Sequence, residues 1–166
     1  ETPYFDLVRT EDKHGLRIKK TSVAVLPYTI DQTGIVEQIG ILKEVNPLRD
    51  SGYADTLITG TIEDNDTDAY ETAVRELHEE GGIDMRQDSP DNWIYLGAFH
   101  DSKDTDREIP IFAVDVTGKE VGAPKTDGSE QERNSKFGLV ATVSRFASFP
   151  AYVSLSNTIT FEISGN

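Results

Sequence analysis

The chain has 166 residues, of which 36% are hydrophobic, and its 30 acidic and 16 basic residues give a net charge of −14. This length suits one compact domain that buries its core without disulfide or metal staples. The negative charge opposes binding to nucleic acid or to an anionic membrane, so we expect neither partner. Cysteine is absent, which excludes disulfides, thiolate metal sites and thiol nucleophiles and favours a cytoplasmic location.

The apolar residues of the first part of the chain fall in short, strand-sized runs. Residues 21–28 and 34–45 are rich in β-branched side chains, and residues 31–34 between them have turn composition. This pattern predicts a hairpin. After a polar loop, residues 56–59 form a short strand candidate that ends at Gly60.

One helix is predicted over residues 68–80, where the period of the pattern changes. Its apolar side chains recur at helical spacing: Tyr70, Ala73, Val74 and Leu77. Either Thr67 or Asp66 would cap its N-terminus, and the glycine pair at 81–82 would end it. The helix therefore follows a strand and a polar loop directly.

Further strands are predicted over residues 93–99 and 110–116. A long polar stretch, 117–135, follows them, and loops of that length in a compact domain are often functional. The last thirty residues alternate like a strand although a helix would suit their place in the chain. Both alternatives stay open there.

Three carboxylates gather near the end of the predicted helix. Glu76, Glu79 and Glu80 stand at offsets 0, +3 and +4 and so share one side of it. They repel one another, and the C-terminal end of a helix dipole disfavours anions. A divalent cation would compensate them, and oxygen ligands favour Mg²⁺ or Mn²⁺. The alternative is a solvated acidic face.

The string Arg75-Glu76-Leu77-His78-Glu79-Glu80-Gly81-Gly82-Ile83 resembles the second half of the Nudix box at every specified position. The resemblance implies an α/β fold, the Nudix α/β/α sandwich with a mixed curved sheet between helices. It covers about residues 21–150 of a single domain, 1–166. Arg75 and Gly82 would be structural, and the metal ligands would be Glu76, Glu79, Glu80 and the carbonyl of Gly60.

The first half of the box departs from the family pattern. Thr61 stands where the family has glycine, and Thr67 where it has a glutamate that normally pairs with the box arginine. Arg75 must therefore find another partner. The sequence leaves three candidates: Glu63, Asp66 and Glu71.

The resemblance implies a nucleotide pyrophosphohydrolase that acts on a nucleoside-diphosphate-linked small molecule. ADP-ribose or a nucleotide sugar is favoured over a nucleoside triphosphate or dinucleoside polyphosphate. Glu76 and Glu79 would carry the reaction, joined by Glu130 or Glu132 from the late polar loop. The alternative is an inactive Nudix-fold binding or structural module, such as a subunit of a larger assembly. A monomer and a homodimer both remain open.

Overall fold

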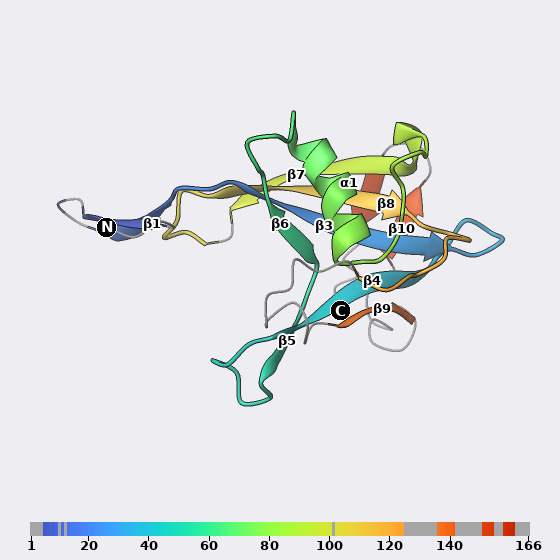
Figure 1. Ribbon diagram of the computed structural model, residues 1–166, viewed down its shortest axis with the longest axis horizontal. Coiled ribbons are helices and arrows are strands. Elements are labelled where there is room, and N and C mark those ends of the chain that lie inside the picture. The colour runs from blue at the N-terminus through green and yellow to red at the C-terminus, as the bar shows by residue number, and fades with distance from the viewer. Residues whose placement is uncertain are drawn as a thin grey trace.

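The computed structural model describes residues 5–9, 11, 13–100, 102–124, 136–141, 151–154 and 158–161, with the last two segments described as backbone only. Seven strands form one mixed sheet: β3 (Ser22–Ile30), β4 (Val36–Val45), β5 (Tyr53–Thr56), β6 (Ile58–Thr61), β7 (Trp93–His100), β8 (Glu108–Asp115) and β9 (Lys136–Ala141). The helix α1 (Ala69–Glu79) lies across one face of this sheet (Figure 1). The mixed sheet and the helix agree with the sequence prediction.

The predicted hairpin is formed by β3 and β4. The turn between them is closed by Asp31, whose Oδ1 accepts hydrogen bonds from the backbone N–H groups of Thr33 and Ile35 at 2.8 and 2.9 Å. The two strands pair antiparallel from Tyr28↔Ile39 onward, with a register shift beside Ile30. This confirms the turn that the composition of residues 31–34 predicts.

Strand β3 is the centre of the sheet. Its first half pairs antiparallel with β6, placing Val23 opposite Gly60. Its other edge pairs in parallel with β8, from Ala24↔Ile111 to Tyr28↔Asp115. Strands enclosed in this way are apolar along most of their length, as β3 is. β4 continues past β3 to pair with β5, and its opposite edge pairs with β9.

The hydrophobic core lies between α1 and the central strands. Ala73 and Leu77 of α1 are fully buried against Val23 and Val25 of β3 and against Ile58 of β6. An aromatic cluster extends this core toward the edge strand, with ring centroids 5.3 to 6.5 Å apart: Tyr70, Trp93, Tyr95 and Phe112. The packing fixes which side of α1 faces away from the sheet.

Several elements differ from the sequence prediction. Within the part of the chain that the structure describes, α1 is the one α-helix, so the second helical layer of the expected sandwich is not found there. The open question about the chain end is answered by two strands, β10 (Ala151–Ser154) and β11 (Thr158–Phe161), which pair antiparallel in a sheet of their own. No helix among the described residues is long and apolar enough to cross a membrane.

A hairpin of β1 (Phe5–Arg9) and β2 (His14–Ile18) precedes the main sheet, and it was not predicted from the sequence. It extends beyond the sheet at the N-terminal side of the molecule (Figure 1). The backbone of Leu16 joins it to the loop before β8, through hydrogen bonds with Asp104 and Asp106 of 2.8 and 3.3 Å. The hairpin is therefore hydrogen-bonded to the loop between β7 and β8.

Candidate functional site

The loop before α1 and the first turn of the helix hold each other in place. Asp68 is the N-cap, with extended backbone, and its Oδ1 accepts the backbone N–H of Glu71 at 2.9 Å. The Glu71 carboxylate in turn accepts the backbone N–H of Thr67 at 2.9 Å. This reciprocal arrangement is close to a capping box. The N-cap is thus Asp68, and the sequence prediction of Thr67 or Asp66 was wrong, because Asp68 is the residue whose side chain reaches the free N–H group.

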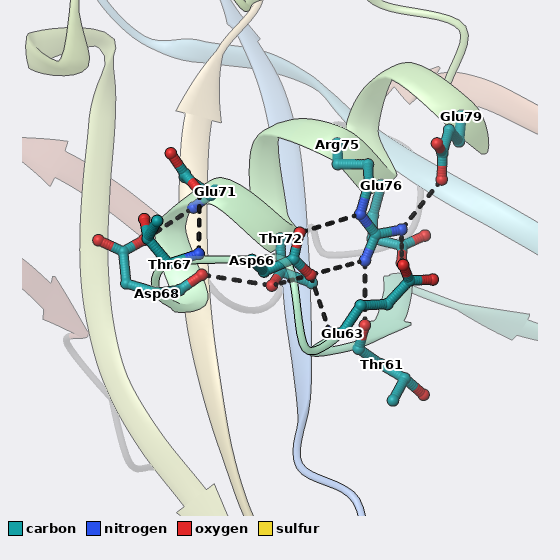
Figure 2. Close-up of polar contacts among 10 residues, drawn as sticks. All are labelled: Thr61, Glu63, Asp66, Thr67, Asp68, Glu71, Thr72, Arg75, Glu76 and Glu79. Atoms are coloured by element: carbon teal, nitrogen blue, oxygen red, sulfur yellow. Dashed lines mark hydrogen bonds and ion pairs between the residues drawn. The ribbon is translucent and has the colours of Figure 1, made fainter.

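The guanidinium of Arg75 joins the loop and the helix glutamates through hydrogen bonds (Figure 2). Its Nε and Nη2 donate to the two carboxylate oxygens of Asp66 at 3.3 and 3.0 Å, and Nη2 also donates to the carbonyl of Thr61 at 3.0 Å. Its Nη1 donates to Glu76 Oε1 at 2.7 Å and to Glu79 Oε2 at 3.0 Å. A guanidinium offers five N–H groups. These contacts therefore engage every nitrogen of the side chain.

The partner of Arg75, which the sequence left open, is Asp66. Its side chain is only 7% exposed. It also accepts the Thr72 hydroxyl and the backbone N–H of Glu63, both at 2.9 Å. The hydrogen bond from Arg75 is the main cause that lowers the pKa of Asp66 to about 2. Glu63 thus contributes its backbone to this loop, and Glu71 belongs to the helix cap.

Glu76 lies against Gly60, where strand and helix approach most closely. Glu76 is 8% exposed. A Cβ atom at position 60 would overlap its carboxyl carbon and Oε1. Burial raises the pKa of Glu76 to about 7, opposed by Arg75 and reinforced by the charges of Glu79 and Glu63. The missing side chain of Gly60 is therefore what makes room for a buried carboxyl group.

The end of the helix places the remaining box residues. Glu79 is the more open carboxylate, with 39% of its side chain exposed. Glu80 is the C-cap, and its backbone N–H donates to the Glu76 carbonyl at 2.8 Å. Gly82 follows with φ +65°, and a Cβ there would overlap the carbonyl oxygen of Gly122. Both the backbone angle and the close approach require glycine at position 82.

The carboxylates near the end of α1 have the donor chemistry for a divalent cation, although they do not surround an ion position. In the described part of the chain, no three His, Asp or Glu side chains surround a common ion position. Glu76 and Glu79 instead converge on one nitrogen of Arg75. Two carboxylates brought together by one cationic group, one of them buried, are chemically suited to Mg²⁺ or Mn²⁺. Glu130 and Glu132, predicted to join the site, lie outside the described residues.

Two contributors were not identified from the sequence. Thr72, fully buried on α1, donates its hydroxyl to Asp66, and the carbonyl of Thr61 accepts from Arg75. The role of Thr72 could have been inferred from its position, because it is a threonine on the apolar side of the helix, six residues after Asp66. The second is a backbone group, so no side-chain pattern marks it.

No family model matches this chain, and no curated protein sequence matches it. Among solved structures, an ADP compounds hydrolase is 16% identical, with a TM-score of 0.53 over 85% of this chain and 71% of that chain. A structure from a study of MutT of Aliivibrio salmonicida and Vibrio cholerae is 22% identical, with a TM-score of 0.48 over 75% of this chain and 80% of that one. The likeness to the ADP compounds hydrolase shows the fold, and the Nudix fold expected from residues 75–83 is confirmed.

Proposed function

We propose that this Nudix-fold chain is a metal-dependent hydrolase that cleaves the phosphoanhydride bond of a nucleoside-diphosphate-linked compound. One observation carries the proposal: Glu76, nearly buried over Gly60, and Glu79 meet at a single nitrogen of Arg75. The C-terminal end of a helix disfavours clustered anions, and burying the charge of Glu76 adds to that cost. Sites that break local rules in this way are often functional.

In this proposal Glu76, Glu79 and Glu80 hold the cation, and the carbonyl of Gly60 completes the set. When bound, Mg²⁺ or Mn²⁺ would neutralise the adjacent phosphates and lower the pKa of the attacking water. Glu76 is fixed by its close packing on the strand, which suits a permanent ligand. Glu79 is more exposed, so it can also accept a proton from the water as the new P–O bond forms and the bridging P–O bond of the anhydride breaks, releasing the other phosphorylated fragment.

The overall charge of the chain supports a cation-dependent reaction. A net charge of −14 repels a polyphosphate substrate. The guanidinium closest to the carboxylates, that of Arg75, is already committed to Asp66, Thr61, Glu76 and Glu79. A bound divalent cation would therefore supply the positive charge that the phosphates need.

Within this reaction class we favour ADP-ribose or a nucleotide sugar as substrate. The structure with the TM-score of 0.53 is described as an ADP compounds hydrolase, which is in keeping with that preference. Nucleoside triphosphates and dinucleoside polyphosphates are the second class. Glu130 or Glu132 would add a base or ligand from the late loop, and the active unit would be a monomer or a homodimer.

The second candidate is a Nudix-fold module that binds or assembles without turnover. The observation that favours it is the saturation of Arg75, which ties Glu76 and Glu79 into an ion-pair cluster that is complete without a metal. Such a cluster could serve stability alone. A folded protein that hydrolyses nothing would be the mark of this module.

The test is a hydrolysis panel in Mg²⁺ or Mn²⁺ with ADP-ribose, nucleotide sugars, dinucleoside polyphosphates and nucleoside triphosphates. Wild type is compared with Glu79→Gln and with Glu71→Gln, which removes the same charge at the other end of α1. Turnover that is lost in the first variant and kept in the second supports the hydrolase and identifies the substrate class. Silence with every compound, in a folded protein, would support the binding module.

A further inference from the structure

We propose that Asp66 is a positioning residue of this site, which anchors the Arg75 guanidinium so that a cation can take its place between Glu76 and Glu79. The inference rests on the proposed function, because it concerns how the same carboxylates become available to a metal. Asp66 itself touches neither Glu76 nor Glu79 in the contacts described above. Its effect would pass through Arg75.

The geometry of the Asp66–Arg75 pair fixes the plane of the guanidinium. Two nitrogens, Nε and Nη2, donate to the two oxygens of one carboxylate at 3.3 and 3.0 Å. Paired contacts of this kind set orientation as well as distance. Nη1 is the nitrogen left over, and it is the one that faces Glu76 and Glu79.

Asp66 can act as an anchor because its own position is fixed. The backbone N–H of Glu63 and the hydroxyl of Thr72 both donate to its Oδ2 at 2.9 Å. Thr72 is fully buried in α1, so the contact ties the loop to the rigid side of the helix. A carboxylate with this many donors does not follow the movements of Arg75.

The anchor divides the guanidinium into two parts. Nε and Nη2 hold the loop through Asp66 and the carbonyl of Thr61, whereas Nη1 holds the two glutamates. A cation that binds Glu76 and Glu79 would have to replace only the Nη1 contacts. If the Asp66 charge were lost, these glutamates would be the remaining charged partners of Arg75, and it would compete with the cation more strongly.

The position of Asp66 is a feature of this particular chain. The Nudix box resemblance places the partner of the arginine at position 67, which is Thr67 here. Thr67 is exposed, and its backbone N–H serves the helix cap through Glu71. The carboxylate one residue earlier reaches Arg75 in its place, which explains how the site tolerates the departure.

The experiment measures Mn²⁺ binding by electron paramagnetic resonance of the free ion, without substrate. The variants are Asp66→Asn, Arg75→Gln and the double variant, with Asp64→Asn as the matched control, since Asp64 is an exposed acid of the same loop. We expect Asp66→Asn to weaken binding by on the order of 10- to 100-fold, the range for partners that orient metal ligands. Asp64→Asn should stay within about threefold, a loss of the size expected for one exposed charge.

The double variant decides between positioning and a structural role. If Asp66 acts through Arg75, Asp66→Asn adds nothing to Arg75→Gln, because the coupling runs through the guanidinium. An equal loss in both backgrounds would overturn the proposal and assign the effect to the contacts with Glu63 and Thr72. If Asp66→Asn does not fold, Asp66→Glu takes its place, since it keeps the charge but displaces the anchored guanidinium.

The same variants separate this proposal from the proposed function. If wild type binds no Mn²⁺, the metal-dependent hydrolase is contradicted. Thermal unfolding of the metal-free variants then still tests the anchor, because an Asp66–Arg75 coupling in the melting temperature supports it. Independent effects of the two substitutions on the melting temperature would overturn it.

Discussion

The two ends of α1 carry acidic residues with opposite physical consequences. At the N-terminal end Asp68 and Glu71 accept free backbone N–H groups and lie at the positive end of the helix dipole. At the C-terminal end Glu76 and Glu79 share one guanidinium at the negative end of the dipole, and Glu76 is buried as well. The acidic residues at the N-terminal end stabilise the helix, whereas those at the C-terminal end lower the stability of the metal-free protein.

The surroundings of each charge distinguish the acidic residues that stabilise the helix from those that we propose bind a metal. Acidic residues at the first end need no further explanation, because each accepts a backbone N–H group of the helix or of the loop just before it. Those at the second end are held in place at a cost to the metal-free protein.

The single substitutions Glu76→Gln and Glu71→Gln should have contrasting effects on turnover and opposite effects on stability. Glu76→Gln should lower turnover by more than about 100-fold, beyond the loss typical of residues that only orient a metal ligand. It should also raise the melting temperature at pH 8, because a neutral amide avoids burying a charge. Glu71→Gln should keep turnover and cost about 0.5 kcal/mol at the helix N-terminus. Hydrolysis rates and thermal unfolding of both variants give the answer.

A Glu76→Gln variant that is less stable than wild type at pH 8 would contradict the contrast between the two ends. It would mean that Arg75 more than compensates the buried charge. Equal loss of turnover in Glu71→Gln would likewise show that the whole helix, rather than its C-terminal end, supports the reaction.

The stability of the metal-free protein should depend on pH through Glu76. In the folded protein its pKa is about 7, above the ordinary value of 4.5, because of burial. Between these values the folded state holds the proton more tightly, so the stabilisation is present at low pH and is lost as pH rises through 7. At about 1.4 kcal/mol per pKa unit, the loss is on the order of 3 kcal/mol.

Denaturant unfolding of wild type and Glu76→Gln at pH 5 and pH 8 measures this contribution. The variant should match wild type at pH 5 and exceed it at pH 8, since it cannot ionise. A constant difference between the two proteins across this range would show that Glu76 does not titrate there.

Gly60→Ala should destabilise the protein by about 1–3 kcal/mol, the usual cost of forcing an added methyl group into a packed site. The new Cβ would overlap the Glu76 carboxyl group, so Glu76 would have to move. The matched control is Gly138→Ala in β9, where an added Cβ meets no atom within 4 Å. Comparison of the two free energies of unfolding tests whether position 60 is special, and similar values would show that it is not.

A small effect is expected for substitution of the N-cap residue. Asp68→Ala removes the acceptor for the Glu71 N–H and should cost about 1 kcal/mol, the typical loss for an N-cap carboxylate. Asp68→Asn keeps an acceptor and should recover most of that loss. Thermal unfolding of both variants is sufficient, and equal melting temperatures for Ala and Asn would contradict the assignment of Asp68 as the cap.

Elements with a strong local pattern could be predicted from the sequence. The helix and the β3–β4 hairpin were predicted correctly because apolar period and turn composition are properties of neighbouring residues. The helix cap was misplaced by one or two residues because Asp66, Thr67 and Asp68 are all good caps by type. The β1–β2 hairpin was missed, since its short strands are mixed in polarity and give no clear alternation.

The box pattern names residues of the candidate site but not their geometry, and the roles of those residues stay predictions. Arg75 and the glutamates follow from the box pattern, whereas Asp66 was one of three equal candidates for the partner of Arg75. Only the fold of the loop decides among them. The contact between Gly60 and Glu76 depends on how β6 lies against α1, and no spacing in the sequence records it.

The parallel pairing of β3 with β8 has a consequence for how the molecule folds. A contact beside this pairing, from Ile30 to Thr117, joins residues 87 positions apart, whereas β6, the loop and α1 are adjacent in sequence. Closing a long chain segment is slow compared with forming local turns and helices. Much of the Arg75 network can thus form early from neighbouring residues, before the long segment closes to pair β8 with β3.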